Sequence, residues 1–210
     1  MTTRLPACAL LRRSSARTWR DERAAQLVEF AVALPVLVVF VVGIFDFSGA
    51  FTLKQKLTNV ARDAARAAAA DPANDLTQFS TAVPVSVSDA LQVIDNYLVA
   101  NKINDCGLLT TAPVLTLPAT WTYSATGNGC PGTGLIITIN RAYYFPAGVA
   151  AQAPNVSCAA TTAGNPTVIA TCVSLQYAYQ WRFGRVESLL GSTAGLPSSI
   201  TAVSVAMNEN

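Results

Sequence analysis

The chain has 210 residues, enough for one ordinary domain and an anchoring segment. Its net charge is +2 and only 12% of its residues are charged, which argues against a basic surface for nucleic acid. Histidine is absent, and no carboxylate pair, Gly-Lys-Ser/Thr motif or cluster of metal ligands stands out. We therefore expect no enzyme, no cofactor, no metal and no small-molecule substrate.

Basic residues dominate the first 24 positions. Asp21 and Glu22 are the acids there, and they are outnumbered by arginines at Arg4, Arg12, Arg13, Arg17, Arg20 and Arg23. A bias of this kind is typical of targeting segments. We interpret residues 1–24 as a basic leader.

Residues 30–45 carry no charged side chain. Sixteen residues span about 24 Å as a helix, and extension to about residues 28–51 reaches the roughly 30 Å of a bilayer core. The arginines before this segment place the N-terminus in the cytoplasm by the positive-inside rule. The sequence thus predicts a single-pass protein of the bacterial inner membrane, with its C-terminal part in the periplasm.

Apolar residues recur at helical spacing beyond the charge-free run, from Leu53 to Ala68. One helix over residues 25–70, ended by Asp71-Pro72, accounts for both parts. The alternative is a secretory signal cut after Ala50, which would release a soluble, disulfide-containing binding domain. Glu29 at the start of the apolar run and the continuing helical pattern favour the membrane anchor.

Residues 71–210 are predicted to form an α+β domain with an antiparallel sheet. The pattern indicates a helix at 87–103, strands at 115–123, 134–144, 167–183 and 200–207, and a short helix at 185–190. Strand 167–183 alternates apolar and aromatic residues with polar ones, so one face should be buried. We expect that face to pack on the lower half of the long helix, although a row of aromatics is also compatible with a ligand platform.

Four cysteines follow the apolar segment, an even set that suits disulfides in an oxidising compartment. We favour Cys106–Cys130 and Cys158–Cys172 because both close local loops, each stabilising by about 3 kcal/mol in the chain-entropy model. The alternative is four free, buried thiols. The loop at 127–132 matches G-x-G-x-x-G, but a strand pattern follows it where a phosphate-binding loop needs a helix.

Several spaced elements of residues 23–69 resemble the TadE-like family of minor pilins and pseudopilins in tight-adherence (Flp-type) type IV pili. They are Val28-Glu29-Phe30-Ala31, Pro35, Gly43-Ile44 with Asp46, Ala61-Arg62 and Ala65-Arg66. The resemblance implies a structural subunit that supports pilus assembly and surface adhesion. It also implies cleavage of the Ala24–Ala25 bond by a prepilin peptidase, although the family more often has Gly where this chain has Ala24.

The partners that the resemblance implies are other pilin and pseudopilin subunits, the prepilin peptidase, the inner-membrane assembly platform and membrane lipid. Nucleic acid is not among them.

Glu29 has a physical rationale of its own, because a carboxylate within lipid costs about 2.5–3.5 kcal/mol and normally has a partner or a function. After cleavage, the α-amine of a neighbouring subunit can neutralise it, so that Glu29 with Phe30 sets the register of packed helices. The alternative is an acid at headgroup level, the position that we also expect for Asp46. Pro35 is interpreted as a helix kink. Arg62 and Arg66 lie on one helical face, which we expect to be solvated in preference to binding a partner acid.

Overall fold

The computed structural model describes residues 18–72, 82–116, 119–144, 158, 169–182 and 196–208, with side chains from residue 24 onward. Most of the predicted leader, the predicted helix at 185–190 and both ends of the predicted strand 167–183 lie outside these residues. The chain divides into two compact units, residues 1–44 and 45–210.

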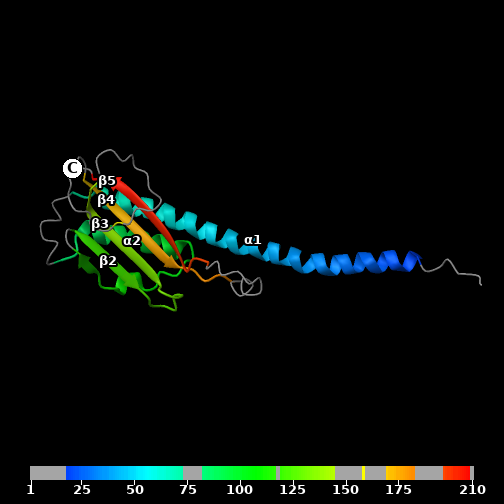
Figure 1. Cartoon of the computed structure of the whole chain (residues 1–210). Helices are drawn as coiled ribbons and strands as arrows, with labels where there is room; N and C mark the ends of the chain where they lie inside the picture. The colour runs from blue at the N-terminus through cyan, green and yellow to red at the C-terminus, as the bar shows by residue number, and fades with distance from the viewer. Residues whose placement is uncertain are drawn as a thin grey trace, which may run out of the picture. The chain divides into compact units, whose positions relative to one another are not determined.

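The first element is α1, an α-helix of 53 residues from Thr18 to Ala70 (Figure 1). It confirms the long N-terminal helix predicted from the sequence, and it contains Pro35 without ending there. The helix ends directly before Asp71-Pro72. Proline disfavours the α conformation of the residue that precedes it, which explains this end point.

Residues 45–210 contain a five-stranded antiparallel sheet in the order β1-β2-β3-β4-β5. The strands are β1 (Val114–Thr116), β2 (Thr120–Ala125), β3 (Leu135–Tyr144), β4 (Ile169–Ala178) and β5 (Ser199–Met207). The order follows the chain, so each strand pairs with the strand that precedes it. The predicted α+β class with an antiparallel sheet is confirmed.

The single strand predicted at 115–123 is wrong. Residues 114–116 and 120–122 pair with each other as the antiparallel strands β1 and β2, with Thr116 opposite Thr120. Pro118, between them in the sequence, has no N–H for a sheet ladder and is a poor residue for the middle of a strand. The alternation of apolar residues alone did not reveal this break.

One face of the sheet is covered by α2 (Val85–Ala100) and the C-terminal part of α1, as Figure 1 shows. The main core contains Leu57, Val60, Ala61, Ala64 and Ala68 from α1 together with inward-facing residues of α2, β2, β3 and β4. The predicted packing of the sheet on the lower half of the long helix is confirmed. The aromatic residues of β2 and β4 lie within this core, so they do not form an open ligand platform there.

The opposite face of the sheet carries a second, smaller core of Tyr143, Cys158, Ala170 and Cys172. A register shift in β3 between Asn140 and Tyr143 accompanies it. The buried Asn140 side chain accepts a hydrogen bond from the Ala142 N–H at 2.9 Å and donates one to the Cys158 carbonyl at 3.2 Å. The Asn140 side chain therefore bonds both to the irregular part of β3 and to the backbone of Cys158 in the second core.

Candidate functional site

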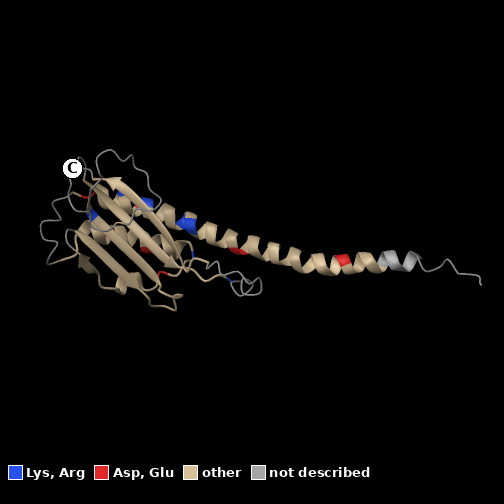
Figure 2. Ribbon diagram, viewed as in Figure 1, with Lys and Arg blue, Asp and Glu red and all other residues tan. Residues whose placement is uncertain are grey.

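The described part of residues 1–44 is an apolar helix whose side chains are exposed. Leu27 is 70% exposed, Phe40 69% and Ile44 68%. The helix from Ala24 onward is long and apolar enough to cross a membrane, with a mean hydropathy of 2.7 in its most apolar window and none of that window buried. Figure 2 shows long uncharged stretches along this part of α1. Apolar surface on all sides of a helix indicates a surrounding that is itself apolar.

Glu29 lies on one side of this helix among apolar side chains. They are Val28, Val32, Ala33, Val36, Leu37, Phe40 and Val41. Ala24, Ala25 and Phe30 are exposed as well. The structure thus presents Glu29 as a carboxylate with apolar neighbours on the same helix.

Arg62 and Arg66 are both exposed, whereas Ala61, Ala64 and Ala65 beside them are buried in the core. The two guanidinium groups therefore lie on the face of α1 turned away from the sheet. That exposure is compatible both with a solvated face and with a surface that binds a partner acid.

Sequence reasoning missed a cluster of side chains around Asp46. The Tyr179 hydroxyl donates to the Asp46 carbonyl at 3.3 Å, and the Arg182 backbone N–H donates to Asp46 Oδ1 at 3.2 Å. The rings of Phe47 and Trp181 have centroids 5.3 Å apart, and those of Tyr179 and Trp181 stack edge to face at 5.0 Å. Asp46 is 7% exposed. The cluster joins α1, directly after its apolar run, to the segment that leaves β4.

Gly49 makes room for this cluster. A Cβ atom at this position would lie 3.1 Å from the Tyr179 hydroxyl, whereas one at Gly43 would meet nothing within 4 Å. The small residues Ser48-Gly49-Ala50, which also suggest a signal-peptide cleavage site, thus have a packing role at Gly49. Burial, and then the Asp46 carboxylate, raise the pKa of the Tyr179 phenol above its ordinary value.

A fully buried arginine holds the C-terminal end of α1. The Arg141 guanidinium donates to the Ala68 carbonyl, to the Asp71 carbonyl at 3.0 Å and to Thr171 Oγ1 at 2.9 Å. The last carbonyls of a helix lack intrahelical donors and carry partial negative charge, so a cation there is favourable. The one charged residue in the strand β3 is the sequence signal that could have identified it.

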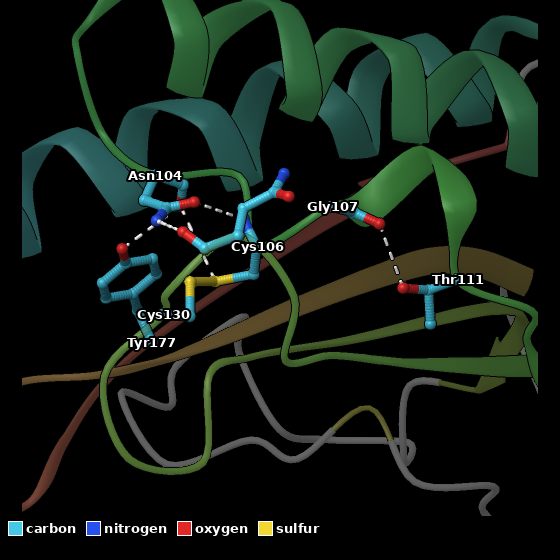
Figure 3. The surroundings of a disulfide bond; sticks show 7 residues. Asn104, Cys106, Gly107, Thr111, Cys130 and Tyr177 are labelled. Carbon is cyan, nitrogen blue, oxygen red and sulfur yellow. Dashed lines mark hydrogen bonds between the residues drawn. A yellow bond between two sulfur atoms is a disulfide. The ribbon is translucent and has the colours of Figure 1, made fainter.

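The first disulfide, Cys106–Cys130, joins the segment after α2 to the loop between β2 and β3 (Figure 3). Asn104 organises this site. Its side-chain oxygen accepts from the Cys106 N–H at 2.9 Å, and its carbonyl accepts from the Tyr177 hydroxyl at 3.1 Å. The Gly127 N–H donates to the Cys106 carbonyl at 2.8 Å, so this amide of the G-x-G-x-x-G loop binds the segment after α2 and not a phosphate.

The second disulfide, Cys158–Cys172, lies in the smaller core. The two bonds are the local pairings that the sequence favoured. Among the residues that the structure describes, no group of three or more cysteine, aspartate or glutamate side chains is placed to hold a metal ion.

No curated protein matches the chain, and no solved structure does. The family comparison concerns the N-terminal part, where the exposed apolar helix, Glu29 and the first core residues of α1 are found. Residues 24–66, about a fifth of the chain, match the family model of TadE-like protein, which confirms the resemblance seen in the sequence.

Proposed function

We propose that this protein is a minor pilin or pseudopilin that takes part in assembly of a tight-adherence pilus and thereby supports surface adhesion. One observation carries the proposal: the TadE-like segment coincides with an exposed apolar helix that bears a single carboxylate, Glu29, between residues 24 and 45. Such a surface needs lipid before assembly and neighbouring helices after it. TadE-like proteins are structural, which agrees with a non-enzymatic role.

In this proposal residues 1–24 form a leader, and a prepilin peptidase cuts the Ala24–Ala25 bond. Residues 28–51 cross the inner membrane with the N-terminus in the cytoplasm, and residues 71–210 lie in the periplasm. Two disulfides in that domain agree with an oxidising compartment. The partners are other pilin subunits and the membrane assembly platform.

Glu29 sets the register between subunits in this scheme. The new α-amine at Ala25 of one subunit neutralises the carboxylate of its neighbour, which removes the cost of a charge in lipid. Glu29→Gln keeps the size of the side chain and removes the charge. Membrane insertion of this variant should be retained, while its incorporation into pili should fall.

The test is the mass and N-terminal sequence of the full chain recovered from membranes, with and without a co-expressed prepilin peptidase. A start at Ala25 that requires the peptidase is expected. Ala24→Gly should be cut at least as efficiently, and Ala24→Leu should block the cut, because the position before the bond takes small residues. An intact N-terminus both with and without the co-expressed peptidase would contradict cleavage of the Ala24–Ala25 bond.

The same measurement distinguishes the secretory alternative, which predicts a soluble product starting at Phe51. Such a cut would remove Asp46 and Phe47, which contact the segment 179–182 within the domain. The loss of these contacts favours the anchored form over the secreted one.

A further inference from the structure

The cluster around Asp46 combines an exposed aromatic ring, two half-buried aromatic rings and an exposed arginine. Phe47 is 62% exposed, Tyr179 and Trp181 are half-buried, and Arg182 is exposed. Three hydrogen bonds hold it, two to Asp46 and one from the Trp181 indole N–H to the Pro197 carbonyl at 2.9 Å. A set of rings fixed in this way but left partly uncovered on a small domain points to an interaction surface.

The position of the cluster in the chain identifies the partner. Asp46 is the first charged residue after the run 30–45, and it lies nineteen positions after Leu27. Nineteen residues of α-helix rise about 28 Å, close to the roughly 30 Å thickness of a bilayer core. If the charge-free run 30–45 fills the hydrocarbon core, residues 46–51 at the end of the proposed span 28–51 lie in the headgroup layer, and the cluster lies at that level with them.

The side chains fit that level. Tryptophan and tyrosine are enriched at membrane–water interfaces because their rings are apolar at one end and polar at the other. An arginine there extends its alkyl chain along apolar surface and places its charge among headgroup phosphates. Phe47 supplies apolar area on the side of the apolar run.

We propose that Phe47, Tyr179, Trp181 and Arg182 form an interfacial collar that binds the headgroup layer of the bilayer and fixes the depth of the membrane helix. The inference rests on the proposed membrane insertion of α1. It adds to that function a lipid-binding surface on the globular domain, in which Phe47 comes from the TadE-like segment and Tyr179, Trp181 and Arg182 come from far outside it in the sequence. The Asp46 contacts fix the segment 179–182 to the helix at this level.

The test uses the full chain in phosphatidylcholine–phosphatidylglycerol vesicles whose acyl chains carry bromine either near the headgroup or near the bilayer centre. A Trp19→Phe background leaves two indoles, of which Trp121 is 1% exposed in the core. The matched control adds Trp181→Phe, so that the difference between the two proteins reports Trp181 alone. Flotation with the vesicles is measured first on both proteins.

Shallow bromines should quench the Trp181 signal at least about twofold more than deep bromines, as expected for an interfacial indole. Stronger quenching by deep bromines would overturn the proposed depth. Quenching by aqueous iodide without quenching by bromine would place Trp181 in water, and protection from both would indicate a protein cover. Either result overturns the collar while leaving membrane insertion intact, whereas a chain that does not float overturns both.

Discussion

The two parts of α1 use apolar residues in different ways. Residues 30–45 are apolar on every side and exposed, whereas residues 57–69 are apolar along one stripe and buried against the sheet. A stripe at helical spacing needs one covering surface, which the domain supplies. An apolar surface all round needs a surrounding that covers every side, such as lipid or a bundle of other helices. The distribution of apolar residues around α1 thus indicates the environment of each part: lipid or other helices for residues 30–45, and the sheet of the domain for residues 57–69.

The largest effect on stability is expected from Arg141, whose side chain binds the carbonyls at the buried end of α1. Arg141→Met removes the donor to the Ala68 and Asp71 carbonyls and leaves polar atoms without a partner. The free energy of unfolding should fall by about 3–5 kcal/mol. Denaturant titration of the full chain in detergent, followed by Trp121 fluorescence, measures it. Arg62→Met, at an exposed position, is the control, and an equal loss in both variants would refute the role of Arg141.

The comparison itself can be tested with two leucines of the same helix. Leu57 is fully buried and Leu37 is 62% exposed. Leu57→Ala should lower the free energy of unfolding by about 3–4 kcal/mol because it leaves a cavity in the core. Leu37→Ala should leave domain unfolding unchanged and weaken only partition into membranes. If Leu37→Ala lowered the free energy of unfolding as much as Leu57→Ala, residues 30–45 would also contribute to the core of the domain, and the proposed difference between the two parts of α1 would be wrong.

The disulfides should affect the stability of the domain and not the association of the apolar helix with membranes. Replacing Cys158 and Cys172 by alanine together opens a loop with a sequence separation of 14, and the domain should lose about 3 kcal/mol of stability. Flotation of the full chain with vesicles should not change. A loss of membrane association in this double variant would show that the two regions are coupled.

The smallest effect on stability is expected from the pair of acids Asp95, in α2, and Asp105, in the segment after it. Burial, and then the charge and hydrogen bond of Asp105, raise the pKa of the Asp95 carboxyl. A raised pKa in the folded state means that the folded protein binds more protons, so stability falls as pH rises from about 4 through the folded pKa and stays lower at neutral pH.

Asp95→Asn should therefore be slightly more stable than the parent at pH 7 and should lose that part of the pH dependence. Thermal unfolding of the full chain between pH 4 and pH 7 measures it, with the exposed Asp63→Asn as the control. A steeper pH dependence in Asp95→Asn would contradict the assigned cause.

The sequence predicted the features that depend on local pattern. The long helix, its end before Asp71-Pro72 and the buried alternation of Val173, Leu175 and Tyr177 follow from periodicity and breaker residues. The helix predicted at 87–103 is present as 85–100, and strand β4 ends at Ala178, short of the predicted 183.

Contacts between distant segments were beyond that reasoning. Arg182 meets Asp46 across 136 positions, and Arg141 meets Ala68 across 73. No periodicity within one segment encodes such a pair. The hairpin at 114–125 was missed for a different reason, since two short strands with a proline between them have the same alternation as one longer strand.

The hydrogen-bond partners of Arg141 come from the beginning, the middle and the end of the domain. Its partners come from the end of α1, from Thr171 on β4 and from Asn208 directly after β5. Asn208 returns a bond from its side-chain amide to the Arg141 carbonyl at 3.2 Å. A chain synthesised only as far as β4 therefore holds a charge whose set of acceptors is incomplete, and β4 is then an open sheet edge. The acceptors of Arg141 are complete only when the residue 67 positions beyond it is present, so a chain that ends at β4 should be less stable than the finished domain.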